Sequence, residues 1–235
     1  MYSVSPFSLL LSFISCVKIS MEQGDAPPQD ATTDHTHSDP RLAARLLDII
    51  ENHIVPLTQE SVQRGDKIFG AALLRKSDLS LILAATNAES ECPLWHGEVV
   101  AIRKFYELPA ARRPPPEDVL FLATHEPCSL CLSAISFSGF DNFYYLFSHE
   151  SSRDDFAIPH DLRIFKEVFG CDDGAYRTKN AYWSGYSIGD SFASCHPCSE
   201  EEIAFAERFS RVQQVYAAMS NVYQSTKGRC QIPLP

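Results

Sequence analysis

The sequence predicts an α/β fold in which helices cover both faces of a central mixed sheet, a three-layer α-β-α sandwich. Three observations predict it. Helix-like and strand-like stretches follow one another in the order helix–β–β–α–β–α–β–α. The 235 residues are 45% hydrophobic, which provides enough apolar surface for a core. The run 119–123 is apolar at every position, as expected for a strand buried between two layers.

The elements can be assigned in chain order from apolar spacing and turn signals. Pro40 suits a first helical position, and apolar residues at helical spacing follow it until Pro56 interrupts a helix that resumes to Gly65. A polar turn joins the first two strand-like runs. In order, the predicted elements are this helix, strands 68–74 and 79–85, a helix 93–106, a strand 119–123, a short buried helix 128–139, a strand 143–147 and an amphipathic helix 161–169.

The predicted organisation has three parts. Residues 1–38 form a flexible N-terminal tail, because the stretch 21–38 is polar and has no helical or strand period. Residues 1–20 are a possible dispensable extension of this tail, because Met21 opens a more typical N-terminus of a soluble protein. Residues 39–170 form the main domain. Residues 171–235 form a C-terminal extension that begins rich in glycine and aromatic residues and ends in a helix at about 200–224.

Charge and hydropathy exclude several classes of protein. Thirty acidic residues against twenty basic ones give a net charge of −10, which argues against a protein that clamps long nucleic acids. No run reaches the ~18 apolar residues of a membrane span, so no membrane partner is expected. The apolar segment 6–17 is similar to a signal-peptide core, but no Lys or Arg precedes it. We therefore expect a cytoplasmic protein.

The residues that indicate chemistry are His96-Gly97-Glu98 and, thirty residues after Glu98, Cys128 and Cys131. One imidazole and two thiolates suit Zn²⁺, and three protein ligands leave the fourth tetrahedral position open for water. His96 and Glu98 lie near the start of one predicted helix, so both side chains can face one cleft. Cys128 and Cys131 are three residues apart at the start of another helix, which places both sulfurs on one side. The pattern predicts a catalytic zinc centre between two helix N-termini.

The arrangement H-x-E…P-C-x-x-C resembles the signature of the cytidine and deoxycytidylate deaminase superfamily, which includes cytosine, guanine and tRNA adenosine deaminases. The flanking residues 99–102 and Ile135 agree with the family pattern. Residues 69–74 resemble its first strand, which packs under the substrate, and Asn87 matches an asparagine that holds the base or sugar. The resemblance covers about residues 39–170 and implies the family's three-layer fold.

The resemblance also implies a mechanism. Zinc held by His96, Cys128 and Cys131 would activate a hydroxide that attacks the amino-bearing carbon, with Glu98 as the proton shuttle. The implied substrate is a small nucleobase, nucleoside or nucleotide, and the implied assembly is a homodimer. Residues expected to contact the substrate are Asn87, Phe69, Ala71, Gly97 and Trp95.

The substrate class has a preferred interpretation and two alternatives. Most relatives carry alanine between the histidine and the glutamate, and Gly97 resembles the free-cytosine branch, so a small pyrimidine is preferred. The acidic balance of the chain favours the same choice. The first alternative is a purine deaminase acting on guanine or on adenosine in RNA. The second is a zinc-stabilised binding module without turnover.

Several residues keep two interpretations. Asn87 could cap the end of a strand, and Trp95 could pack at the start of its helix. His125 could face the cleft, but a structural residue that closes a buried strand is preferred. Cys195 and Cys198 form a second C-x-x-C pair, which suggests either a second metal site or free thiols in a loop.

Overall fold

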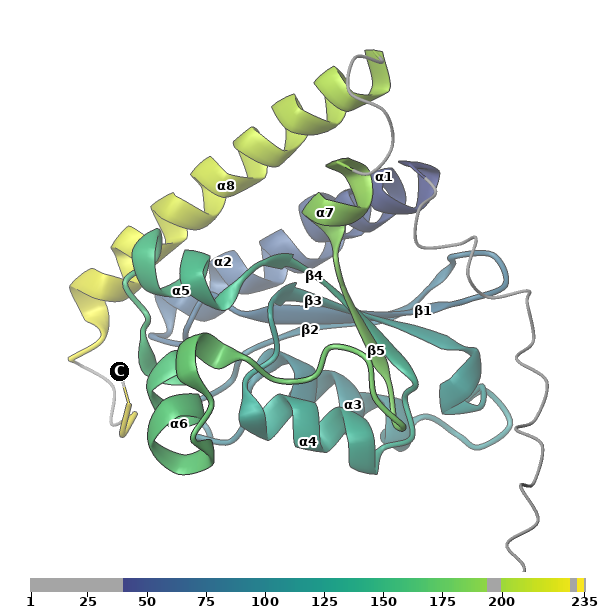
Figure 1. The fold of residues 1–235 in the computed structure, drawn as a ribbon, viewed down its shortest axis with the longest axis horizontal. Coiled ribbons are helices and arrows are strands. Elements are labelled where there is room, and N and C mark those ends of the chain that lie inside the picture. The colour runs from purple at the N-terminus through teal and green to yellow at the C-terminus, as the bar shows by residue number, and fades with distance from the viewer. Residues whose placement is uncertain (1–39, 194–199, 229–231, 235) are drawn as a thin grey trace, which may run out of the picture. The chain divides into compact units, whose positions relative to one another are not determined.

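In the computed structural model, which describes residues 40–193, 200–228 and 232–234, five strands form a mixed sheet (Figure 1). The strand order is β2-β1-β3-β4-β5. Strand β1 runs antiparallel to β2 and β3, whereas β4 runs parallel to both β3 and β5. The bounds are β1 (Gly70–Arg75), β2 (Leu81–Thr86), β3 (Val119–His125), β4 (Asn142–Phe147) and β5 (Ser184–Ser187).

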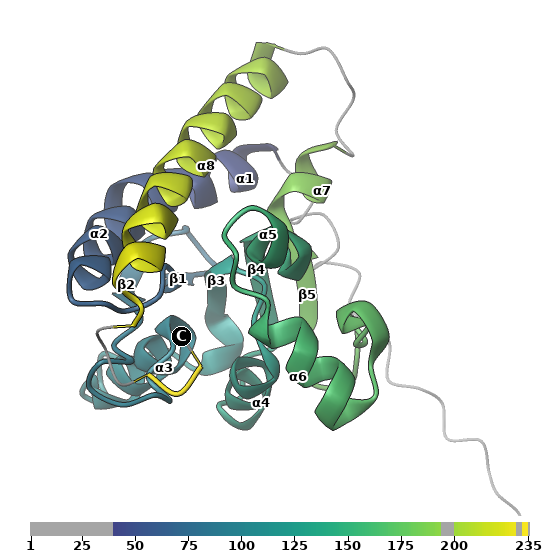
Figure 2. The ribbon, with the colours of Figure 1, turned by 90° about the vertical axis from the view of Figure 1, so that its left-hand side faces the viewer.

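Helices cover both faces of this sheet, which confirms the predicted three-layer class (Figures 1 and 2). One layer holds α1 (Pro40–Ile49), α2 (Val55–Gln63), α5 (His149–Asp154), α7 (Ile188–Ala193) and α8 (Glu200–Thr226). The opposite layer holds α3 (Gly97–Glu107), α4 (Ser129–Phe137) and α6 (His160–Phe169). Short 3-10 turns lie at Pro116–Asp118 and Asp172–Gly174.

The sheet separates two apolar clusters, one under each helical layer. Alternating side chains of β1 divide between them: Ala72 and Leu74 join the cluster under α1, α2 and α8, whereas Ala71 and Leu73 join the one under α3 and α4. Strand β3 is buried at all seven positions, as the apolar run predicts.

A π-helical turn at Ile50–Ile54 connects α1 to α2. Pro56 lies in the first turn of α2, where its missing N–H is least costly. The predicted interruption at Pro56 is therefore a local change of helical pitch and not a break between two helices.

Strand β5 lies in the glycine- and aromatic-rich start of the C-terminal extension, for which the sequence predicts no regular element. It is four residues long and pairs with β4. Gly185 is needed there, because a Cβ at this position would lie 2.4 Å from the ring of Phe143. Because small residues allow this close approach, the strand has no alternation of apolar and polar residues. The sequence therefore does not predict it.

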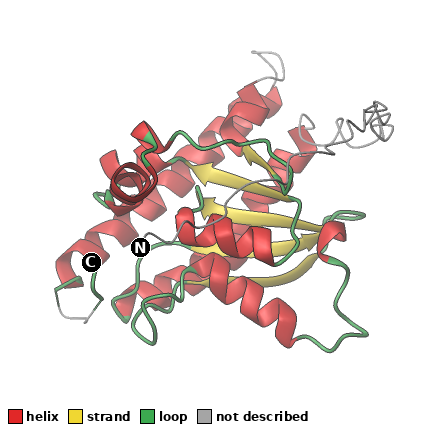
Figure 3. Ribbon diagram, turned by 60° about the horizontal axis from the view of Figure 1, so that its bottom comes forward, coloured by secondary structure: helices red, strands yellow, loops and turns green. Residues whose placement is uncertain are grey.

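Among the described residues, no helix combines the length and the apolar character needed to cross a bilayer. Figure 3 shows the strands enclosed by helices and loops. The predicted tail 1–38 and the pair Cys195 and Cys198 lie outside the described residues. The three-part organisation stays a prediction.

Candidate active site

Two helix N-termini meet beside the ends of β1 and β3. His96 immediately precedes α3, and Cys128 immediately precedes α4, both with extended backbone. Cys131 lies in the first turn of α4 and is fully buried. The two helices pack on the same face of the sheet, where both contribute side chains to one apolar cluster. The connections between strands and helices thus bring the three predicted ligands together.

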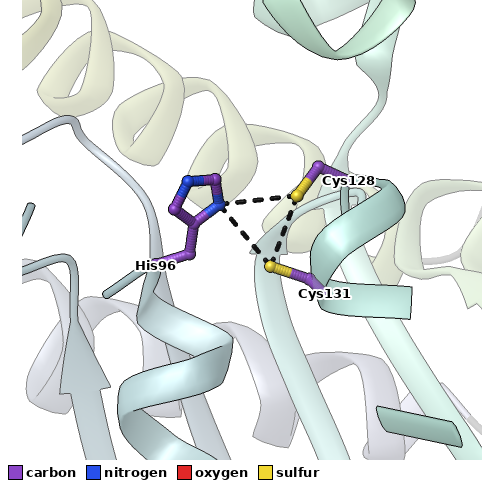
Figure 4. Close-up of side chains that lie close together, drawn as sticks. All are labelled: His96, Cys128 and Cys131. Carbon is purple, nitrogen blue, oxygen red and sulfur yellow. Dashed lines mark hydrogen bonds between the residues drawn. The ribbon is translucent and has the colours of Figure 1, made fainter. Parts of the chain in front are cut away.

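The three ligand atoms form a nearly equilateral triangle (Figure 4). His96 Nδ1 lies 3.4 Å from Cys128 Sγ and 3.6 Å from Cys131 Sγ, and the two sulfurs are 3.5 Å apart. Tetrahedral zinc, with bonds of ~2.3 Å to sulfur and ~2.0 Å to nitrogen, requires ligand separations of roughly 3.5–3.8 Å. The cluster fits Zn²⁺.

Charges within the triangle are strongly coupled. The pKa of Cys128 lies well below its usual value, because it shares a hydrogen bond with Cys131 and lies beside His96. Burial and the neighbouring Cys128 thiolate hold the pKa of Cys131 well above its usual value. For His96, burial acts to lower the pKa, but the hydrogen bond and charge of Cys128 outweigh it and raise the pKa to about 9. Without metal, the site therefore carries a thiolate beside an imidazolium.

Glu98 lies in the first turn of α3 and is almost fully buried. Its pKa is raised to about 7, because burial disfavours the carboxylate and the Cys128 thiolate adds negative charge nearby. His96 acts in the opposite direction. A carboxyl group with this pKa can both accept and donate a proton near neutral pH.

Glu98 and two of the ligands border one small pocket, whose empty space is about 200 Å³ with the open solvent at its mouth included. Phe69, a predicted substrate contact, lies on its wall. Three further residues line the pocket, and the sequence predicts no part in the reaction for any of them. The full lining is Phe69, His96, Glu98, His125, Glu126, Cys128 and Asp161.

Asp161 and Glu126 are the acids that sequence reasoning missed. Asp161 is in the first turn of α6, and burial together with the Cys128 charge raises its pKa to about 8. Glu126 accepts hydrogen bonds from Tyr176 Oη at 2.6 Å and from the His149 amide at 3.1 Å. An acid before Pro127 was visible in the motif, whereas nothing local in the sequence distinguishes Asp161 from other helix-starting acids.

The four other predicted substrate contacts, Asn87, Ala71, Trp95 and Gly97, do not line this pocket. Asn87 is fully buried, donates to Glu89 Oε2 at 2.8 Å and accepts a hydrogen bond from the Gly97 amide. Ala71 is buried in β1 against the α3 and α4 layer. Trp95 packs at the start of α3 under Arg103, whose guanidinium lies 5.3 Å from the indole ring. Asn87 thus secures the first turn of α3, next to His96.

Gly97 has a packing reason for being glycine. A Cβ at this position would lie 2.8 Å from Gly70 Cα and 3.0 Å from the Phe69 carbonyl oxygen, both of them backbone atoms of the strand region below. The absence of a side chain lets the start of α3 approach β1 closely. Close packing therefore explains Gly97 without reference to the substrate.

Residues 51–147 match the model of the cytidine and deoxycytidylate deaminase zinc-binding region. This segment contains all three ligands and Glu98. The chain therefore contains a segment that matches this deaminase family, with the three ligands and the glutamate at the expected positions. The predicted resemblance to this superfamily is confirmed.

Solved structures of deaminases resemble this chain at low identity. Guanine deaminase from Nitrosomonas europaea is 17% identical, with 73% of this chain and 84% of that chain covered and a TM-score of 0.42. Guanine deaminase from Bacillus subtilis is 26% identical, with coverage of 57% and 86% and a TM-score of 0.43. A tRNA:A34 deaminase is 22% identical, with coverage of 58% and 98% and a TM-score of 0.38. No curated protein matches the chain.

Proposed function

We propose that this protein is a zinc-dependent hydrolytic deaminase of a small, uncharged nucleobase or nucleoside. The observation that carries the proposal is the shared pocket, in which Glu98 lies beside His96 and Cys128 of a cluster that fits Zn²⁺. Hydrolytic deamination consumes one water and releases ammonia, and it requires both an activated water and a proton carrier. This pocket provides for both.

Each residue has a definite part in the proposed reaction. His96, Cys128 and Cys131 would hold the zinc, which when bound supplies Lewis acidity that activates water. Glu98 takes a proton from the attacking water, delivers it to the ring nitrogen beside the amino-bearing carbon and then assists protonation of the departing ammonia. Its raised pKa suits both directions of transfer. Phe69 offers an apolar surface to the flat face of a base.

The charges of the pocket favour an uncharged substrate. The carboxyl groups of Glu98, Glu126 and Asp161 line it, and no Lys or Arg is among its described lining residues. A phosphate in such surroundings would lose its hydration without a Lys or Arg partner. A free base or a nucleoside is therefore favoured over a nucleotide.

Cytosine-type substrates are the first candidate, because the lining of the pocket is acidic. The close packing of Gly97 on β1 removes one of the two reasons for the pyrimidine preference, and the overall charge remains. Guanine is the second candidate, favoured by a specific observation. The Asp161 carboxyl group can accept hydrogen bonds from base N–H groups, and guanine carries more of these than cytosine does.

The test is ammonia release from a panel of bases, nucleosides, nucleotides and adenosine-containing RNA, with the zinc-loaded protein. We expect turnover of a free base or nucleoside, and we expect Glu98→Gln to retain zinc while losing at least ~10² in activity. Glu91→Gln, which changes an exposed acid in the loop before α3, is the matched control and should remain active.

Either of two results would contradict the proposal. Undiminished turnover by Glu98→Gln would remove Glu98 from the mechanism. If the protein binds one zinc per chain and deaminates nothing on the panel, the non-catalytic binding module becomes the better interpretation. The homodimer implied by the resemblance is a separate proposal. The molar mass of the purified protein, measured by light scattering, tests it directly.

A further inference from the structure

A buried ion pair lies behind the zinc ligand His96. Lys67 Nζ is 2.6 Å from Glu89 Oε1, and the two side chains are only 6% and 1% exposed. Lys67 precedes β1, and Glu89 follows β2 in the loop that leads to α3. Burying two charges is costly, and removing one partner of such a pair is strongly destabilising. Neither residue lines the pocket, so the proposed reaction does not account for the pair.

The contacts of Glu89 hold its carboxylate in one orientation. Oε2 accepts hydrogen bonds from Asn87 Nδ2 at 2.8 Å and from the Lys67 amide at 3.3 Å. Oε1 accepts from Lys67 Nζ and lies 3.8 Å from His96 Nε2. Asn87 also accepts a hydrogen bond from the amide of Gly97, the residue that follows His96. The network therefore connects Glu89 to the backbone next to this ligand.

The two nitrogens of His96 face different groups. Nδ1 faces the sulfurs of Cys128 and Cys131, whereas Nε2 faces Glu89. A histidine that binds a metal through one ring nitrogen must carry its proton on the other, and an adjacent carboxylate fixes both this tautomer and the orientation of the ring. Glu89 is the only acid that the ion-pair geometry of the described residues places beside His96 Nε2.

We propose that Glu89, held by Lys67, is a positioning residue that sets the tautomer and orientation of His96 for zinc. Lys67 compensates the charge of the buried carboxylate, so that the pair contributes orientation without adding net negative charge to a site that already holds two cysteine ligands. This inference rests on the zinc centre of the proposed function, but it concerns metal binding and not turnover.

The rival interpretation is that the pair only ties two loops together. The two interpretations differ in what happens when both charges are removed. Replacing a buried ion pair by apolar residues is often neutral or stabilising for the fold. If the pair is only a structural tie, zinc affinity should return to normal in the double variant Lys67→Met with Glu89→Leu. If Glu89 positions His96, zinc affinity should stay weak in that variant.

The experiment measures zinc affinity by chelator competition, the visible spectrum of the Co²⁺-substituted protein and the thermal stability of the metal-free protein. We expect Glu89→Gln to weaken zinc binding ~10–100-fold and to shift the Co²⁺ bands. The double variant should show the same loss of affinity even though its metal-free fold is as stable as that of the unmodified protein. Lys76→Met, which breaks an exposed ion pair with Asp141, is the control and should bind zinc normally.

Zinc affinity and Co²⁺ bands unchanged in Glu89→Gln would overturn the inference, as would normal affinity in the double variant. If Glu89→Gln does not fold without metal, the double variant alone decides. Since no substrate is present, the result is independent of the proposed deamination. A protein that binds zinc through this network but releases no ammonia would contradict the proposed function and leave the role of Glu89 intact.

Discussion

Asp161 occupies the pocket together with Glu98 but comes from a different helix, α6. With a pKa of about 8, the Asp161 carboxyl group is largely protonated at neutral pH, so its hydrogen bond to a substrate contributes ~0.5–1.5 kcal/mol, or roughly 2- to 10-fold in affinity. We therefore predict that Asp161→Asn lowers kcat/KM by ~2–10-fold, mainly through KM, and that zinc content is unchanged. Asp155→Asn, an exposed acid in the same region, is the control. Steady-state kinetics with equal effects of both substitutions would remove Asp161 from substrate recognition.

Substitution by alanine should affect stability differently at Gly97 and at Gly189. A Cβ on Gly97 would meet the backbone of Phe69 and Gly70, which cannot move without distorting β1, whereas a Cβ on Gly189 would meet only Ser187 Oγ at 3.8 Å. Gly97→Ala should therefore cost ~1–3 kcal/mol in the free energy of unfolding and weaken zinc binding by displacing His96. Gly189→Ala, in α7, should be neutral or slightly stabilising. Urea denaturation of the two variants checks this, and equal stabilities would contradict it.

The site illustrates what a sequence can reveal at the scale of single residues. The catalytic glutamate and the zinc ligands fall into two pairs that are close in sequence, His96 with Glu98 and Cys128 with Cys131. A sequence motif therefore identifies them. Asp161 reaches the pocket only because α6 packs beside α4 in the fold. Glu89 is equally hidden, because its partner Lys67 is 22 residues away. Residues that depend on long-range packing leave no local pattern.

At the scale of elements, α8 is connected to the pocket through the sheet. The ring of Tyr216 is fully buried and lies 5.3 Å from the ring of His125, a pocket residue, and 5.2 Å from that of Phe147. We predict that Tyr216→Ala costs ~3–5 kcal/mol in the free energy of unfolding, because a large cavity opens between α8 and the sheet. Gln214→Ala, exposed on the same helix, should change it by less than ~0.5 kcal/mol. Similar unfolding midpoints for the two variants would show that α8 contributes little to the core.

The elements that the sequence predicts best are those with a continuous apolar pattern. The strand predicted at 119–123 begins where β3 begins, and that predicted at 143–147 differs from β4 by one residue. By contrast, α5 and β5 are short and depend on their neighbours. Helix α5 begins with a hydrogen bond from the Ser151 amide to Ser148 Oγ, and β5 is held by its pairing with β4. Such elements are stabilised by tertiary contacts more than by their own sequence.

For the molecule as a whole, zinc joins the starts of α3 and α4 and should stabilise the fold by mass action. At a free zinc concentration 1,000 times Kd, the gain is ~4 kcal/mol, which corresponds to a rise in Tm of roughly 8–16 °C for a protein of this size. Chelation should reverse this rise. Cys131→Ser, which removes one ligand, should lose most of it.

This stabilisation should also depend on pH, and its sign follows from the site. In the metal-free fold the pKa of His96 is raised to about 9, so its charged form stabilises that fold fully below pH 6.5 and progressively less as the pH rises toward 9. Zinc requires the opposite, since it must displace the protons of His96 and Cys131. The gap in Tm between zinc-loaded and metal-free protein should therefore widen between pH 6 and pH 8 at fixed free zinc. Calorimetry at both pH values measures it, and a gap that is constant or that narrows would mean that protons and zinc do not compete at these residues.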